Sequence, residues 1–202
     1  VRSRGLGDVY KRQEYLRTEG LIELEVGETV KIGTRAGVKT VARTEEGYAI
    51  DMGPWSFIHG DAAREGGEDC LVSARGLKTP RAGLSISMGN PHTVVMLGSD
   101  GKLDGLDLHS LPQVNPAPVN GTNVEFVVPV DLDVESGAQV GAIRMRVHER
   151  GVGETLSCGT GACAAAAATR FWGGEEAPDE WLVHVPGGTL AVTFVLGPDD
   201  LE

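Results

Sequence analysis

The chain has 202 residues, of which 41% are hydrophobic, and a formal net charge of -11 at pH 7. Its length and apolar content suffice for one full core and a second, smaller one, so we expect a globular protein. The acidic balance argues against nucleic acid or an anionic membrane as partner, because both need a basic face. The sequence shows neither an apolar run that could span a bilayer nor an apolar N-terminal signal. We therefore expect a cytoplasmic protein with a small-molecule or protein partner.

Residues 1–13, VRSRGLGDVYKRQ, show no hydrophobic periodicity and carry four basic side chains. Within them, DVYKRQ at 8–13 resembles the translation of the mosaic-end adaptor used in transposon-based sequencing libraries. We interpret residues 1–13 as an artefactual extension that packs against nothing, and we exclude them from the fold prediction. The alternative is a genuine basic arm.

From residue 14 the chain continues with EYLRTEG, which is typical of the end of a short helix. Short apolar stretches bounded by turn residues then predict strands at 21–26, 29–33, 38–43 and 48–52. The polar stretch 59–70 has no clear period and predicts a loop or an irregular surface helix.

Further strands are predicted at 84–88, 93–97, 123–130, 138–148 and 182–196, with a connector rich in proline and glycine at 115–121. Residues 162–172, ACAAAAATRFW, predict a helix, because alanine is the best helix former and the segment follows a glycine-rich turn. Such a helix has little side-chain volume, so neighbours can approach its axis. The pattern predicts an α+β architecture with a central helix.

Three cysteines, Cys70, Cys158 and Cys163, form no CxxC pair, which disfavours a disulfide framework and a structural zinc site. At least one thiol is free, and a free cysteine is ordinarily a small buried hydrophobe. The histidines lack paired metal-ligand spacing, and none of the lysines lies in a recognisable Schiff-base context. We expect no metal and no cofactor.

The sequence SCGTG at 157–161 leads into the predicted helix. A cysteine at a helix N-terminus lies at the positive end of the helix dipole, so we expect the pKa of Cys158 to be lowered toward neutrality. Gly159 and Gly161 leave the backbone N–H groups open to an anion such as a carboxylate. The motif predicts a proton-transfer thiol beside an anion cradle, although a redox or acyl-transfer nucleophile fits it as well.

Apolar and polar residues alternate just upstream, as in a half-buried strand: Ile143, Met145 and Val147 with Arg144, Arg146 and His148. The same phase places Glu149 on the inward face, where Arg150 or a substrate ammonium would be its partner. A structural ion pair between Glu149 and Arg150 is the alternative.

Residues 147–164, VHERGVGETLSCGTGACA, resemble the second active-site signature of diaminopimelate epimerases almost position for position. MGNPHTV at 88–94 and NVEF at 123–126 resemble two substrate-contact strands of that family. TRAGV at 34–38 resembles a turn of its first domain, and VPGGTL at 185–190 its late hairpin. The resemblance covers nearly everything from residue 14 onward.

The resemblance implies two similar domains, each a curled, mainly antiparallel sheet around a central helix. Residues 14–55 would be the remnant of the first domain, and 56–202 a nearly complete second domain without its final returning strand. The full-length protein would be a homodimer.

The activity implied is cofactor-independent epimerisation of LL-2,6-diaminopimelate to the meso isomer, a precursor of lysine and peptidoglycan. Two thiols on opposite faces of the α-carbon exchange the proton, and Cys158 matches one of them. The other would be absent from this chain, which would be inactive alone. Cys163 is assigned to packing.

For substrate binding, the resemblance implies that Asn90 and Asn123 hydrogen-bond the non-reacting end and that Arg150 binds the distal carboxylate. The main-chain N–H groups of Gly159 and Thr160 would cradle the reacting carboxylate.

For catalysis, Cys158 would act with Glu149, which contacts substrate and supports proton transfer, and with His92, which lies beside the thiol. His92 could instead merely satisfy a strand end. A proline or hydroxyproline racemase of the same fold is an alternative, as is a non-catalytic binding module. Glu149 and Arg150 favour diaminopimelate, because they suit a substrate with a second zwitterionic end.

Overall fold

The computed structural model describes residues 24–34, 37–45, 47–131 and 139–195. The chain divides into two compact units, Val1–Pro54 and Trp55–Glu202, which are described separately below. Residues 1–13, and with them the adaptor interpretation, lie outside the described residues. The assignment of 14–55 and 56–202 to two epimerase domains stays a prediction.

The described part of the first unit is a three-stranded antiparallel sheet in the order β1-β2-β3. Its strands are β1 (Thr29–Thr34), β2 (Gly37–Thr44) and β3 (Gly47–Ile50), close to three of the predicted stretches. The prediction of a strand at 21–26 is wrong in its described part, since residues 26 and 27 form a turn that precedes β1.

In the second unit the described strands form one ten-stranded sheet in the order β13-β12-β10-β9-β7-β6-β5-β8, with β11 paired to β10 and β4 paired to β6. The strands are β4 (Ser56–Phe57), β5 (Cys70–Ser73), β6 (Arg81–Ser87), β7 (Pro91–Met96), β8 (Gln113–Asn115), β9 (Asn123–Pro129), β10 (Val140–Glu149), β11 (Gly153–Thr155), β12 (Glu180–Val185) and β13 (Gly188–Thr193). The helices are α2 (Gly60–Gly66), α3 (Asp100–Asp104) and α4 (Gly159–Gly173).

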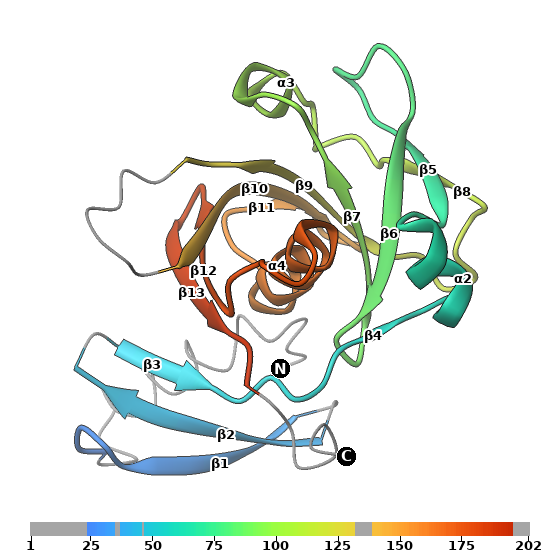
Figure 1. Cartoon of the computed structure of the whole chain (residues 1–202). Coiled ribbons are helices and arrows are strands. Elements are labelled where there is room, and N and C mark those ends of the chain that lie inside the picture. Colours follow the sequence, from blue (N-terminus) through green and yellow to red (C-terminus); the bar gives the residue numbers. More distant parts are fainter. Residues whose placement is uncertain (1–23, 35–36, 46, 132–138, 196–202) are drawn as a thin grey trace. The chain divides into compact units, whose positions relative to one another are not determined.

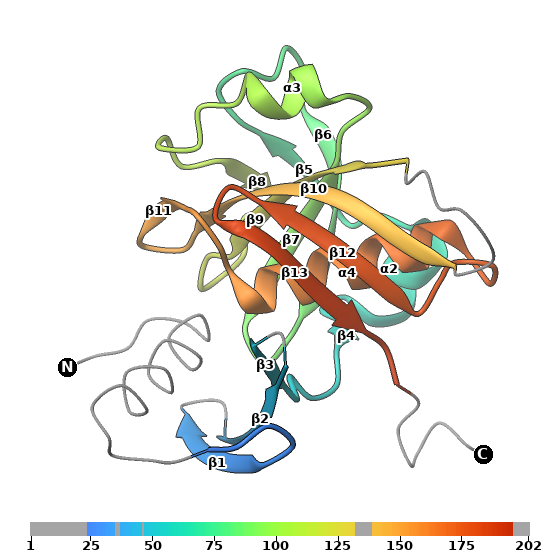
Figure 2. The ribbon, with the colours of Figure 1, turned by 90° about the vertical axis from the view of Figure 1, so that its left-hand side faces the viewer.

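This sheet curls around α4, which contacts β6, β7, β9, β10, β12 and β13 (Figure 1). Viewed from the side, β12 and β13 cross in front of the helix (Figure 2). The alanines at 164–168 are fully buried, and their small side chains allow strands to approach the helix from several directions at once. The predicted α+β fold with a central helix is confirmed.

Among the described strands of this unit two pairs are parallel, β7 with β9 and β10 with β12, and the other pairs are antiparallel. In the β7–β9 pair His92 is the register partner of Asn123, and in the β9–β10 pair Val124 is the partner of His148. The register therefore brings the start of β7, the start of β9 and the end of β10 to the same edge of the sheet.

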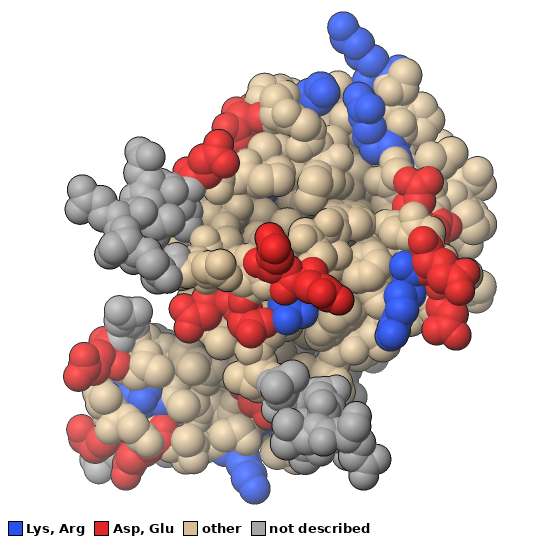
Figure 3. Space-filling model, in the orientation of Figure 1, with Lys and Arg blue, Asp and Glu red and all other residues tan. Residues whose placement is uncertain are grey.

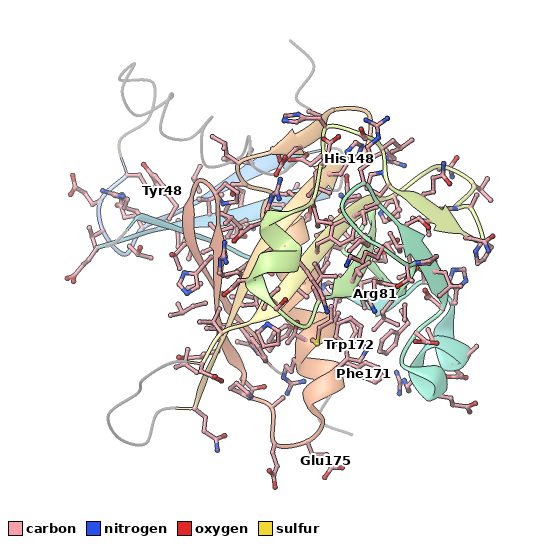
Figure 4. All side chains as sticks on the ribbon, turned by 90° about the horizontal axis from the view of Figure 1, so that it is seen from above. Tyr48, Arg81, His148, Phe171, Trp172 and Glu175 are labelled. Carbon is pink, nitrogen blue, oxygen red and sulfur yellow. The ribbon has the colours of Figure 1, made fainter. Side chains whose placement is uncertain are left out.

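The C-terminal end of α4 is anchored by two aromatic residues, Phe171 and Trp172, which are labelled in Figure 4. The indole N–H of Trp172 donates a hydrogen bond to the carbonyl of Gly67, at 2.7 Å. The ring of Phe171 packs edge-on against Phe57, with 4.8 Å between centroids. These contacts hold the helix against β4 and the loop after α2, and thereby set the position of its other end.

On the other side of the sheet a second apolar cluster lies beneath α3 and includes Leu97, Leu103, Leu108 and Phe126.

The polar residues of the alternating pattern on β10 differ in their exposure. Arg144 and Arg146 are partly exposed. Arg146 forms a bidentate ion pair with Glu154, at 2.7 and 3.0 Å. The outward prediction for His148 is wrong, because its ring is buried and its Nδ1 bonds to the Leu108 carbonyl at 2.8 Å.

Other differences from the predicted elements are local. The stretch 59–70 contains the short helix α2 and the first residue of β5, and the predicted strand 182–196 is the hairpin β12–β13.

Among the described residues no helix is long and apolar enough to cross a membrane. On the face shown in Figure 3, acidic side chains lie in several groups with basic ones between them.

Candidate active site

Cys158 is the N-cap residue of α4, in an extended conformation that directs its side chain over the first turn of the helix. Its sulfur accepts a hydrogen bond from the N–H of Gly161 at 3.4 Å and lies 3.6 Å from Oγ1 of Thr160. The residue is 7% exposed. Both contacts would stabilise a thiolate here: the N–H of Gly161 has no partner within the helix and is satisfied by the N-cap sulfur, and the Thr160 hydroxyl can donate to it.

Gly161 is required by close packing on its Cα. A Cβ atom at this position would lie 2.7 Å from Oε1 of Glu125 and 3.2 Å from the sulfur of Cys158. The thiol and the Glu125 carboxylate therefore both lie against the same glycine. The sequence predicts a backbone N–H at Gly161 that is open to an anionic ligand, whereas in the structure this N–H donates to the sulfur of Cys158 at 3.4 Å.

Glu125 forms a buried pair with His92. Its Oε1 lies 2.7 Å from Nδ1 of His92, and both side chains are fully buried. Sequence reasoning missed Glu125, although the signal was present: NVEF places an acidic residue within an apolar strand, and every residue of β9 except Pro129 is buried. A buried carboxylate needs a partner, and the parallel register of β7 with β9 supplies His92.

The pKa of Cys158 is raised from 9.0 to about 12. Burial of the thiol is the largest cause, followed by the negative charges of Glu125 and Glu149; the hydrogen bonds from Thr160 and Gly161 act in the opposite direction. The prediction of a lowered pKa is therefore wrong for the ligand-free protein. Desolvation and two carboxylates outweigh the helix dipole, which contributes only modestly.

Asn90 and Asn123 join the strand ends to each other and to the helix. The Asn123 side chain donates to the Pro91 carbonyl at 3.1 Å and accepts from the backbone N–H of Arg150 at 2.9 Å. Asn90 donates to Oγ1 of Thr160 at 3.4 Å. The predicted residues of β7, β9, β10 and α4 are thus linked by hydrogen bonds around one end of the helix.

Glu149 and Arg150 follow one another at the end of β10. The Glu149 carboxylate is half-buried and accepts a hydrogen bond from the Thr155 hydroxyl at 2.6 Å. The Arg150 guanidinium is exposed and donates to the carbonyl of Asn120 at 2.7 Å. Glu149 is close enough to Cys158 to raise its pKa, whereas Arg150 extends its charge toward solvent.

The other two cysteines have different surroundings. Cys70 belongs to the apolar cluster beneath α3, and the pKa of its thiol is raised to about 12 by burial and by the neighbouring charge of Asp69. Cys163 lies on α4 and is half-buried, and its assignment to packing stays a prediction. Within the described ranges no group of three or more side chains could hold a metal ion.

A family profile described as diaminopimelate epimerase matches residues 84–195, which is more than half of the chain. The chain belongs to the diaminopimelate epimerase family. It is 38% identical over 198 residues to the diaminopimelate epimerase of Mycobacterium tuberculosis strain H37Rv, covering 93% of this chain and 62% of that protein. To the enzyme of Streptomyces coelicolor it is 39% identical over 171 residues, covering 80% and 52%. This family member thus spans about three fifths or less of these relatives.

Solved structures show the same fold at low identity. A hydroxyproline epimerase from Agrobacterium vitis, with bound trans-4-hydroxy-L-proline, matches with a TM-score of 0.58 and 19% identity over 92% of this chain and 57% of that one. A phenazine biosynthesis protein of the PhzF family from Bacillus anthracis matches with a TM-score of 0.53 and 16% identity, over 91% and 64%. These structures agree with the predicted fold of the diaminopimelate epimerase family.

Proposed function

We propose that this chain is part of an enzyme that epimerises LL-2,6-diaminopimelate to the meso isomer through two cysteines, with Cys158 as one acid/base. The observation that carries the proposal is the placement of the Cys158 thiol at the N-terminus of α4, buried and beside Glu125. Membership of the diaminopimelate epimerase family supports the substrate.

In the ligand-free site Cys158 is a thiol at neutral pH, because its pKa is about 12. It therefore starts as the proton donor of the pair. When the proton leaves, the sulfur keeps the N–H of Gly161 as a donor at 3.4 Å, and the Thr160 hydroxyl can turn toward it from 3.6 Å. Ammonium groups on the substrate would offset the charges of Glu125 and Glu149, so substrate binding would ease formation of the thiolate.

The reacting carboxylate of the substrate would lie at the first-turn N–H groups of Gly159 and Thr160, which have no acceptor within the helix. Negative charge that develops on this group during proton removal makes each such donor worth about 3 kcal/mol. Asn90 and Asn123 would bind the non-reacting end, and Arg150 the distal carboxylate. Glu149 would bind an ammonium group, and His92 would support proton transfer.

The mechanism uses no cofactor, and it needs a second thiol on the opposite face of the α-carbon. We propose that neither Cys70 nor Cys163 supplies it. Cys70 is enclosed in the apolar cluster beneath α3, and Cys163 lies on the same helix as Cys158. The 202-residue chain would then have no activity alone. The full-length protein would be a cytoplasmic homodimer that serves lysine and peptidoglycan synthesis.

The experiment restores the full-length protein and measures isomerisation of LL-diaminopimelate and of L-proline side by side. Turnover of diaminopimelate and none of proline is the expected result. Activity on proline alone would show a proline racemase, and binding of either compound without turnover would show a non-catalytic module. The isolated 202-residue chain, measured in parallel, is expected to give no turnover.

A further inference from the structure

In the buried pair of Glu125 and His92, each side chain has one polar atom with a hydrogen-bond partner in the described part of the chain and one without. The two side chains are fully buried and share one contact of 2.7 Å. Among the described residues, the remaining polar atoms, Nε2 of His92 and Oε2 of Glu125, have no hydrogen-bond partner. Burying such atoms unpaired is costly, and most buried polar atoms in proteins are satisfied. The pair therefore calls for an explanation beyond packing.

The position of the pair links it to the thiol. Glu125 lies in the middle of β9, paired with Val94 of β7 and Val147 of β10. Its Oε1 contacts His92 on one side and, on the other, lies against the Cα of Gly161, one turn from Cys158.

The groups that act on the thiol come from three elements: Glu125 on β9, Glu149 on β10, and Thr160 on α4 itself. His92 on β7 contacts the carboxylate of Glu125.

The contact with Glu125 decides which ring nitrogen of His92 carries the proton. A carboxylate accepts but does not donate, so its contact with Nδ1 of His92 holds the ring proton on Nδ1. The other nitrogen, Nε2, is then the acceptor of the neutral ring. The same carboxylate brings negative charge against Cys158 and disfavours loss of the thiol proton; after burial of the thiol, this charge is the next largest cause of its raised pKa.

We propose, building on the proposed function, that Glu125 is a positioning residue of this site. It leaves Nε2 of His92 as the buried hydrogen-bond acceptor of the ring, and it sets a carboxylate against the same glycine on which the sulfur of Cys158 packs.

The first test observes His92 in the unsubstituted 202-residue chain by 15N NMR at pH 8. We expect a protonated Nδ1 and an unprotonated, acceptor-type Nε2. The opposite tautomer, or a ring protonated on both nitrogens, would overturn the assignment of Nε2 as acceptor. This measurement does not depend on any variant being able to fold.

The second test follows alkylation of Cys158 by iodoacetamide as a function of pH, with the modified site mapped by mass spectrometry. Glu125→Gln keeps the shape of the side chain and removes its charge, so the midpoint for Cys158 should move to lower pH. At pH 8.5 we expect about tenfold faster alkylation for each unit of that shift. An unchanged profile would overturn the effect of Glu125 on the thiol.

Two controls separate this effect from loosening of the fold. Cys70 is an internal control, because its own neighbour is Asp69 rather than Glu125, and its alkylation should stay slow. Glu154→Gln removes another half-buried carboxylate, one that pairs with Arg146, and should leave the Cys158 profile unchanged.

None of these measurements involves turnover, so the two proposals can fail separately. If the full-length protein does not isomerise diaminopimelate while His92 and Cys158 respond as described, the proposed function fails and the role of Glu125 in tuning the thiol stands. If turnover is present and the pH profile of Cys158 alkylation is the same in Glu125→Gln as in the unsubstituted chain, the inference is wrong and the proposed function stands.

Discussion

The hydroxyl of Thr160 lies between two groups of the site, 3.6 Å from the sulfur of Cys158 and 3.4 Å from the side-chain nitrogen of Asn90. Asn90 donates to Thr160, which leaves the hydroxyl proton free to turn toward sulfur. One side chain thereby connects the turn before β7 to the thiol at the start of α4. The contact is one of the two that favour the thiolate.

Thr160→Val is therefore expected to raise the pKa of Cys158 further and to slow the full-length enzyme about tenfold or more, since hydrogen bonds to charged groups contribute about 1.5–3 kcal/mol. The measurements are kcat with diaminopimelate and the alkylation profile of Cys158. Thr169→Val is the matched control: Thr169 is also buried on α4 and donates to the Ala165 carbonyl. Equal effects of both substitutions on alkylation would show that Thr160 acts only through packing.

Gly161→Ala should destabilise the protein, because the added methyl group meets the Glu125 carboxylate at 2.7 Å and the sulfur at 3.2 Å. We expect a loss of about 1–3 kcal/mol in the free energy of unfolding, as for other overpacked sites, and a changed alkylation rate at Cys158. Urea denaturation of the 202-residue chain gives the first quantity. Gly101→Ala is the control, since a Cβ on Gly101 meets nothing within 4 Å. If both variants were equally stable, the close approach would be in doubt.

Stability should fall as the pH rises above about 9. The pKa values of Cys70 and Cys158 are both raised from 9.0 to about 12 in the folded protein. The folded state therefore holds these protons more tightly than the unfolded chain, and the resulting stabilisation is complete below pH 9 and lost as the pH approaches 12. Each thiol should contribute a slope of up to about 1.4 kcal/mol per pH unit in that window.

Urea denaturation at pH 8 and pH 10.5 measures this slope. Cys158→Ala should reduce the dependence on pH, and Cys70→Ala should reduce it by a similar amount. A wild-type protein whose stability is the same at both pH values would contradict the raised pKa values.

The sequence predicted the elements whose pattern is local. The alanine run predicted α4, and the alternation of Ile143, Met145 and Val147 predicted the buried face of β10. The position of Cys158 at the start of the helix followed from the glycines around it.

Features that depend on distant segments could not be predicted in this way. Glu125 lies 33 residues from Cys158 along the chain and reaches it only because β9 packs beside α4. The predicted direction of the Cys158 pKa shift is wrong for the same reason, because the shift depends on burial and on carboxylates of other strands. His148 looked like an outward residue, but α3 and the loop after it cover that side of β10.

The role of Cys158 is tested most directly by isomerisation of LL-diaminopimelate in D2O, with the full-length protein and its Cys158→Ala variant measured together. We expect the unsubstituted enzyme to incorporate deuterium from solvent at the inverted α-carbon, and the variant to lose turnover by a factor of about 100 or more, the usual contribution of a general acid/base. A variant that isomerises diaminopimelate at the unsubstituted rate would contradict the assignment of Cys158 as an acid/base of this site.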